Sequence, residues 1–350
     1  MHSKALVDPA PITRFQRAVY SSRILVAAVC HLKVFEILAK APLPRAGFAG
    51  ALGLKDRPAK VLLPALRAMG LLSISSTGFV EITPLGRHLC PDSVTNLVGY
   101  LGLEQEDPGI QEMARRLQND GPVVAPSGIA YVKEGQEPSP MDDPILARQL
   151  TLALSGRARQ LAPFAAAAMP RSSGHLLDAA GGSGLFALEW LRLNPHGTAT
   201  VFDRPEVLKV AREFKEEFCD SPREGAASVR QRIQFQPGDM LEDELPRADL
   251  VLAASLFHDW PEPTCFKLAQ RFAEVLKPGG ELWIHDAFLN DSMDGPLAVT
   301  DYSAQLFWVT KGRCYSRAEY RRWFREAELE PTSVDVPTAM DYSLISARRS

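Results

Sequence analysis

The amino-terminal third of the chain places its apolar residues mostly at helical spacing. Residues 15–38 carry apolar side chains at near-helical intervals and contain no Gly or Pro, which predicts one long helix. A second helix is predicted over residues 57–69, and Pro64 should bend it because it cannot donate to the preceding turn. Two short β-like runs follow, residues 71–75 and 79–82. Helices followed by a hairpin are typical of a winged helix.

The pattern changes at Leu176, where short apolar runs begin to alternate with helical segments. Just before it, residues 107–142 are rich in Pro, Gly and acidic side chains and predict mostly loop, whereas residues 145–169 predict a long helix. We expect strands over residues 175–178, 199–203, 233–237, 250–254, 282–287, 332–336 and 342–347, and helices over residues 185–193, 206–218, 263–276 and 316–327. Such alternation predicts a mostly parallel α/β sheet.

Composition and charge narrow the class of protein. The 350 residues carry a formal net charge of −3, which disfavours nucleic-acid binding through a strong basic field. The five cysteines are scattered without a CxxC pair, so we expect reduced thiols and no metal site. No signal-peptide pattern is visible, and the apolar run at residues 24–30 is too short to span a bilayer. We therefore expect a soluble, cytoplasmic protein that does not contact a membrane.

A glycine-rich turn follows the first strand of the predicted sheet. The strand ends at Asp178, and Gly181, Gly182 and Gly184 crowd the turn before the next helix. Glycine is needed there because side chains would keep a ligand away from the backbone. Ligands of doubly wound sheets bind at the carboxyl ends of the strands, where this turn lies. The turn therefore predicts a ligand site.

Two later strand ends carry matching polar residues. Asp203 ends the second strand about 20 residues after the glycines, the spacing of an acid that binds ribose hydroxyls, and Arg204 follows it. Asp239 and Met240 follow the third strand, where they could accept from an adenine amino group and pack on the ring. An adenosine-containing ligand is the first hypothesis.

Two adenosine cofactors compete for this site. Gly182, Gly184 and Ala187 fit a loose nicotinamide-dinucleotide fingerprint. S-adenosylmethionine is favoured because Asp178 could hold its amino-acid end but would repel a pyrophosphate. The mid-chain position of the motif, after a mostly helical part, and the two last predicted strands, which resemble the closing hairpin of class I methyltransferases, favour the same cofactor.

A histidine after the fourth strand is the candidate general base. His258 would project towards the cofactor pocket, and a histidine there could take the proton of an acceptor hydroxyl during methyl transfer. Asp259 is a candidate as its neighbour, with a supporting or capping role. Asp286, at the end of the fifth strand, could orient His258 or the substrate. The alternative for each is an ordinary packing or turn role.

Taken in order, these motifs resemble the class I small-molecule O-methyltransferases, which include plant caffeate-type enzymes, acetylserotonin methyltransferase and bacterial polyketide methyltransferases. The resemblance also rests on Leu66-Arg67-Ala68-Met69-Gly70-Leu71-Leu72, Thr83-Pro84-Leu85-Gly86-Arg87 and Leu276-Lys277-Pro278-Gly279-Gly280. It implies a Rossmann-like, mostly parallel seven-stranded domain that binds S-adenosylmethionine, behind an amino-terminal winged-helix dimerisation domain. We therefore expect domains at residues 1–105 and 171–350, with a linker and helices covering the active site at residues 106–170.

The resemblance also implies roles for individual residues. It makes His258 the general base, puts Asp286 in the place of a flanking acid, and puts the glycine turn, Asp203, Asp239 and Met240 at the cofactor. Ala254 or Ser255, which we count with the cofactor site, replaces a basic residue common in the family. Plant members carry Lys-Glu-Arg-Thr at the segment 313–316, so their second flanking glutamate is absent here.

These features predict O-methylation of a small aromatic hydroxyl compound by a homodimer. Acceptor-facing side chains are expected from residues 121–143, 145–169 and 298–310, with Phe307 and Trp308 as stacking or core residues. C- or N-methylation, or a reaction without methyl transfer, stays open. A DNA-binding regulator is a third possibility because of the winged helix, but no basic stripe supports it.

Overall fold

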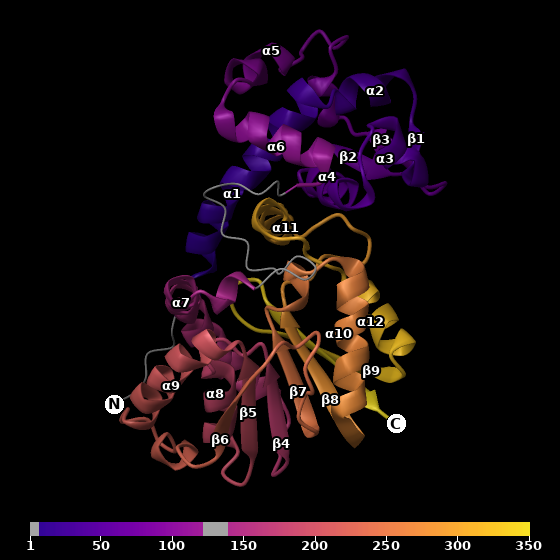
Figure 1. The fold of residues 1–350 in the computed structure, drawn as a ribbon. Coiled ribbons are helices and arrows are strands. Elements are labelled where there is room, and N and C mark those ends of the chain that lie inside the picture. Colours follow the sequence, from indigo (N-terminus) through magenta and orange to yellow (C-terminus); the bar gives the residue numbers. More distant parts are fainter. Residues whose placement is uncertain (1–6, 122–138) are drawn as a thin grey trace. The chain divides into compact units, whose positions relative to one another are not determined.

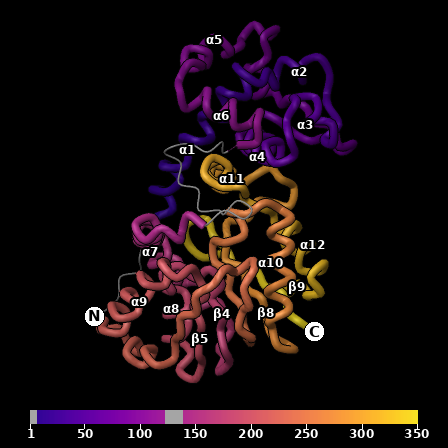
Figure 2. The backbone as a smooth tube through the Cα atoms, in the orientation of Figure 1, coloured from indigo at the N-terminus to yellow at the C-terminus, as the bar shows by residue number. Residues whose placement is uncertain are grey.

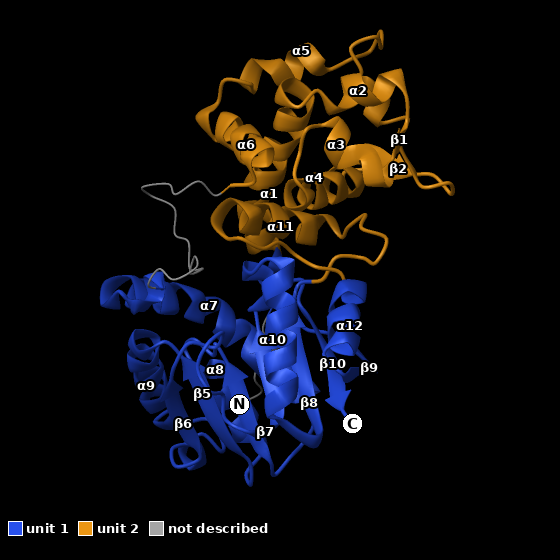
Figure 3. Ribbon diagram, turned by 45° about the vertical axis from the view of Figure 1, so that its right-hand side comes forward, with its two compact units in different colours: residues 1–10, 130–287, 317–350 blue, residues 11–129, 288–316 orange. Residues whose placement is uncertain are grey.

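The computed structural model describes residues 7–121 and 139–350, which divide into two compact units (Figures 1 and 3). The carboxyl-terminal unit contains the described residues of 1–10, 130–287 and 317–350, and the amino-terminal unit those of 11–129 and 288–316. The segment 288–316 thus clusters with the amino-terminal unit, whereas the sequence pattern had assigned it to the carboxyl-terminal domain. Among the described residues no helix is long and apolar enough to cross a membrane.

The amino-terminal unit is mostly helical. Its three short strands form an antiparallel sheet in the order β1-β3-β2, and a helix leads directly into its β2-β3 hairpin. The helices are α1 (Ala10–Val26), α2 (Val34–Lys40), α3 (Phe48–Ala51), α4 (Asp56–Ala68), α5 (Val98–Leu101), α6 (Pro108–Asn119) and α11 (Leu297–Val309), and the strands are β1 (Leu43–Pro44), β2 (Leu72–Ile74) and β3 (Phe79–Ile82).

One prediction for this unit is wrong, and a second leaves out a helix. The long helix over residues 15–38 is two helices, because the chain passes through a π-helical turn at Ala27–His31 and a left-handed residue at Lys33, whose φ is 53°. The predicted loop over residues 107–142 begins with α6, where Asp107 accepts from the backbone N–H groups of Gly109 and Ile110 and caps the helix. Residues 122–138 of that predicted loop lie outside the described residues.

The carboxyl-terminal unit is built on a seven-stranded sheet in the order β6-β5-β4-β7-β8-β10-β9. All neighbours pair in parallel except β10, which is antiparallel to both β8 and β9. The strands are β4 (His175–Ala179), β5 (Thr198–Asp203), β6 (Ile233–Pro237), β7 (Ala248–Ala254), β8 (Leu276–Asp286), β9 (Leu329–Pro337) and β10 (Ser343–Arg349). This confirms the predicted mostly parallel sheet.

Helices cover this sheet in two groups (Figure 1). One group packs together as α7 (Pro144–Ala168), α8 (Leu185–Leu193) and α9 (Pro205–Cys219), and the other as α10 (Glu262–Val275) and α12 (Arg317–Glu326). Strand order reverses direction between β4 and β7, and βαβ crossovers are right-handed, so the two groups lie on opposite faces. The reversal leaves the carboxyl ends of β4 and β7 side by side, where a ligand crevice is expected.

The chain leaves the sheet between its fifth and sixth strands in sequence. After β8 it forms α11, and it returns to the carboxyl-terminal unit at α12, a path that Figure 2 traces. Phe307 of α11 is fully buried in the hydrophobic core of the amino-terminal unit. Its role in that unit is therefore core packing, the alternative to stacking on an acceptor.

Candidate active site

A cavity opens at the carboxyl ends of the central strands, and all of its lining residues belong to the carboxyl-terminal unit. Every residue predicted for the cofactor site lines it except Gly184, which instead precedes α8 with a φ of 72°. One face of α7 supplies a further wall, namely Thr151, Leu154, Ser155, Arg157, Ala158 and Leu161. The structure thus gathers residues from four strand ends and from α7, α8 and α9 around a single space.

The glycine turn after β4 is shaped by close contacts. A Cβ atom at Gly181 would lie 2.8 Å from both the carboxyl carbon of Asp178 and Val201 Cγ1, so a side chain does not fit. Gly182 has a φ of 57°, and its N–H donates to Asp203 Oδ2 over 2.8 Å. This bond ties the turn to the end of β5, and it leaves the backbone of the turn facing the cavity.

Asp178 is a buried carboxylate with an unused oxygen. Its Oδ2 accepts from the Ala187 N–H at 3.2 Å, whereas its Oδ1 has no hydrogen-bond partner among the described residues. Burial, together with the nearby charge of Asp203, raises the pKa of Asp178 to about 7. A buried acceptor that lines a cavity and lacks a donor fits a ligand that brings a cationic N–H group.

Asp203 is held in place by two backbone donors. Its Oδ2 accepts from Gly182 and its Oδ1 from the Arg204 N–H at 2.7 Å. The side chain keeps part of its surface open to the cavity, while burial by the surrounding protein raises its pKa to about 6. Each carboxylate oxygen has a second lone pair, so the fixed carboxylate can also accept from a diol.

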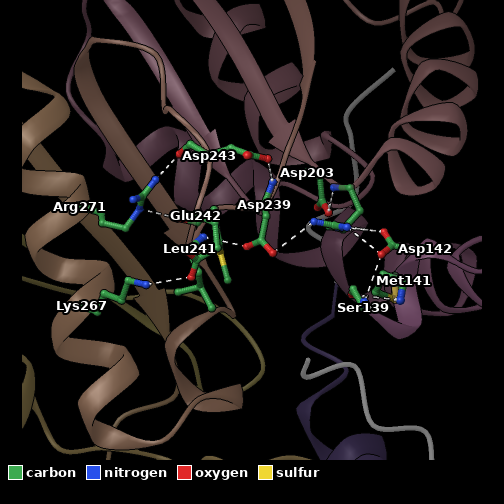
Figure 4. Close-up of polar contacts among 12 residues, drawn as sticks. Ser139, Met141, Asp142, Asp203, Asp239, Leu241, Glu242, Asp243, Lys267 and Arg271 are labelled. Carbon is green, nitrogen blue, oxygen red and sulfur yellow. Dashed lines mark hydrogen bonds and ion pairs between the residues drawn. The ribbon is translucent and has the colours of Figure 1, made fainter. Parts of the chain in front are cut away.

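The Arg204 side chain joins three segments around the cavity. Figure 4 labels Asp142 and Asp239, the two acids that it contacts. Its Nε and Nη2 atoms donate to the two Asp142 oxygens over 2.8 and 2.7 Å, and its Nη1 lies 3.4 Å from Asp239 Oδ2. The Asp239 N–H in turn donates to Asp243 over 2.7 Å. This guanidinium therefore fixes the turn before α7 against the ends of β5 and β6.

His258 and Asp286 form a buried pair beside the cavity. His258 lies on a short 3-10 turn (Phe257–Asp259) after β7, and its Nδ1 is 2.5 Å from Asp286 Oδ1. The other ring nitrogen, Nε2, is 3.7 Å from Asp259 Oδ1. Asp259 lines the cavity with its neighbours Leu256 and Trp260, whereas His258 and Asp286 do not.

The electrostatics of this pair favour an ionised Asp286. Burial acts to raise the pKa of Asp286, but the adjacent His258, with hydrogen bonds from the Tyr320 hydroxyl and the Ala287 N–H, outweighs it and holds the pKa below its ordinary value. For Asp259 burial prevails over His258 and Arg157, and the pKa rises to about 6. Of the two acids beside the histidine, Asp286 therefore has the lower pKa and stays ionised to lower pH.

Sequence reasoning missed Tyr320, which comes from α12 to bind Asp286. It expected pocket side chains from residues 145–169 without naming Arg157, which lines the cavity, or Thr151, whose buried hydroxyl lines it without a hydrogen-bond partner among the described residues. The α7 residues follow helical spacing, so their shared face was visible in the pattern. No spacing rule connects Tyr320 to a strand end 34 residues earlier. Within the described ranges, no group of three metal-ligating side chains occurs.

Comparisons with known proteins agree with this geometry. A family model described as an O-methyltransferase domain matches residues 165–329. Acetylserotonin O-methyltransferase from Macaca mulatta is 30% identical over 309 residues, which cover 83% of this chain and 84% of that protein. The chain belongs to the O-methyltransferase family. It is an S-adenosylmethionine-dependent methyltransferase, so the nicotinamide alternative is set aside.

Two further relatives bear on the acceptor and the fold. The 3-hydroxy-5-methyl-1-naphthoate 3-O-methyltransferase of Streptomyces sahachiroi is 28% identical over 324 residues, covering 91% of this methyltransferase and 89% of the relative. A crystal structure of an O-methyltransferase family 2 protein from Planctomyces limnophilus in complex with apigenin has a TM-score of 0.86 and 34% identity, covering 99% and 97% of the two chains. The likeness therefore spans both units.

Proposed function

We propose that this methyltransferase transfers a methyl group to a hydroxyl of a small aromatic compound, with His258 as the general base. The observation that carries the proposal is the buried pair of His258 and Asp286 beside the cavity. Acetylserotonin and a hydroxynaphthoate in the names of relatives, and apigenin in a related crystal structure, support an aromatic hydroxyl acceptor.

In this proposal the cavity residues hold the cofactor by its three parts. Asp178 takes the amino group of the amino-acid end, because its free oxygen needs a donor. Asp203 accepts from the ribose hydroxyls, and the turn containing Asp239 and Met240 surrounds the adenine. S-adenosylmethionine, when bound, supplies an electrophilic methyl group on a sulfonium. Backbone approach at Gly181 keeps this ligand close to the end of β4.

The histidine then works as a base of fixed tautomer. Its Nδ1–H donates to the ionised Asp286, and Nε2 is the ring atom that would accept the proton of the acceptor hydroxyl. The imidazolium that results is stabilised by Asp286 and by Asp259, whose Oδ1 lies 3.7 Å from Nε2. The acids thereby favour proton uptake during attack, and alignment of acceptor and methyl group contributes the rest of the rate.

The test is the His258→Ala variant. Because a positioned base gives roughly 100- to 10,000-fold in rate, we expect kcat to fall by about that factor while cofactor affinity changes less than about 2-fold. Initial rates are measured by release of S-adenosylhomocysteine with a panel of phenols that includes apigenin, and affinity by calorimetry. Product NMR locates the methyl group and separates oxygen from carbon or nitrogen transfer.

His196→Ala is the matched control, since His196 lies exposed in the turn between α8 and β5. It should turn over like the parent. Parent-like turnover by His258→Ala would show that His258 is not the base.

A further inference from the structure

Tyr320 contacts both Asp286 and the turn that carries His258. It lies on α12, its side chain is fully buried, and its ring packs on Phe257, the residue before His258, with ring centroids 5.4 Å apart. Its hydroxyl donates to Asp286 Oδ2 over 2.8 Å. One side chain therefore touches the turn that carries the histidine and also the acid that binds it.

The Asp286 carboxylate is held from three directions. Oδ1 accepts from His258 Nδ1 and, over 2.8 Å, from the Ala287 N–H, while Oδ2 accepts from Tyr320. Asp286 is 1% exposed, so bulk water does not supply a donor in place of the phenol. A carboxylate oxygen left without a donor at such depth costs free energy, which favours rotation or protonation of the acid.

We infer that Tyr320 is a positioning residue of the methyl transfer, whose hydroxyl holds Asp286 so that its other oxygen faces His258 Nδ1. The inference rests on the proposed role of His258. The Ala287 N–H donates to Oδ1, the oxygen that faces His258, so Tyr320 is the donor that holds Oδ2. The fixation of the pair therefore depends on a neutral phenol from α12.

The rings around Tyr320 make this hydroxyl rigid. Trp323 and Phe324 lie on the same helix with ring centroids 5.1 and 6.3 Å away, so the phenol is enclosed by aromatic side chains. A ring packed in this way loses its rotational freedom when the protein folds. Its hydroxyl is then a preorganised donor, which serves positioning better than a mobile side chain does.

Several titratable and charged groups surround the acid. His258 and Asp259 lie on the turn after β7, His285 precedes Asp286 on β8, and Arg157 of α7 faces His285 and Asp259. Since the Tyr320 bond is one of the contacts that lower the pKa of Asp286, its removal should raise that pKa. If the reaction needs Asp286 ionised, activity should then be lost at a higher pH than in the parent as the pH falls.

The experiment compares Tyr320→Phe with Tyr320→Leu. Phe keeps the ring and removes only the hydroxyl, and we expect kcat to fall about 10-fold, with KM for cofactor and acceptor within about 2-fold. The acid limb of the kcat profile should move to higher pH. A role in packing alone predicts parent-like kcat and pH profile for Tyr320→Phe, with losses only in Tyr320→Leu, and would overturn the inference. Tyr100→Phe makes the same change at a side chain that is 74% exposed and serves as control.

A double-mutant cycle tests the route of the effect. If Tyr320 acts through Asp286, Tyr320→Phe should cost less than about 2-fold in an Asp286→Asn background, whereas an undiminished 10-fold loss there would overturn the inference. His258→Ala, measured beside these, separates the two proposals. Parent-like turnover by His258→Ala would show that His258 is not the base. An inactive His258→Ala together with an unimpaired Tyr320→Phe would overturn the role of Tyr320 alone.

Discussion

At the scale of residues, the proposed contact of Asp178 with the amino group of the cofactor predicts that cofactor binding depends on pH, because the pKa of Asp178 is raised. Without ligand its pKa is about 7, so at pH 6 the carboxyl is mostly protonated. A bound ammonium group favours the ionised form and lowers this pKa, so binding near pH 6 should release a proton. Affinity for S-adenosylmethionine should then rise with pH and level off above about 7.

Calorimetry in buffers of different ionisation enthalpy measures this proton release directly. We expect the apparent binding heat at pH 6 to depend on the buffer in the parent enzyme. The dependence should shrink in Asp178→Asn, which has no proton to lose and should bind at least about 10-fold more weakly, as expected for a lost charge-assisted bond. Heats that are the same in all buffers would contradict the assignment of Asp178 to the amino group.

Residues at strand ends were predictable and residues from distant helices were not. Asp178, Asp203 and Asp239 line the cavity because carboxyl ends of parallel strands meet at one edge, a rule that needs only the strand pattern. Gly184 was expected there too, but its backbone starts α8 instead. Tyr320 depends on how α12 packs, which no local pattern states.

At the scale of elements, the short turn before α7 is secured by one guanidinium. Asp142 ends the 3-10 turn Pro140–Asp142, and both of its oxygens bind Arg204. Met141 of this turn and Ser139, which caps it, line the cavity. Exposed ion pairs contribute little, but this one is bidentate and the two side chains are 26% and 33% exposed. We therefore propose that the Arg204–Asp142 ion pair holds this turn at the cofactor cavity.

Asp142→Ala should free this turn and speed cofactor release. We expect a dissociation rate about 3- to 10-fold faster, because a partly buried bidentate pair is worth on the order of 1 kcal/mol, with little change in kcat. Stopped-flow displacement of the bound cofactor measures the rate. Glu213→Ala is the matched control, since its pair with Arg148 joins α7 to α9 but is about half exposed on both sides. Equal release rates in the two variants would show that Asp142 does not hold the turn in place over the bound cofactor.

The element pattern of the sheet was readable because buried parallel strands form short apolar runs between helices. Strand ends shifted by a few residues, as at β8, which begins at Leu276 and not at residue 282. The breaks in the amino-terminal unit were harder. Lys33 adopts a left-handed conformation without the glycine that would have marked it, and the cap at Asp107 was overlooked within an acidic, Pro-rich stretch.

At the scale of the whole molecule, the sequence order conceals which segments fold together. The segment 288–316 returns to the amino-terminal unit, where Arg57 of α4 donates to the carbonyl groups of Thr310 and Gly312 over 3.1 and 3.2 Å. Such bonds join positions about 250 residues apart, and only three-dimensional packing decides them. The predicted domain boundaries followed chain order and therefore could not include this excursion.

The exposed face of α1 is consistent with the homodimer that the sequence predicts. Ile12, Phe15 and Val19 recur at i, i+3 and i+7 and are 72%, 82% and 43% exposed, an apolar stripe that a solvated helix would not normally carry. A two-fold interface would bury the same stripe from both subunits. Light scattering after size exclusion should therefore give twice the 38.4 kDa chain mass, and Phe15→Glu should shift the mass towards the monomer, because it places a charge in the interface. Val94→Glu, at an isolated and fully exposed position, should leave the mass unchanged. A parent protein that is monomeric at micromolar concentration would show that α1 does not form such an interface.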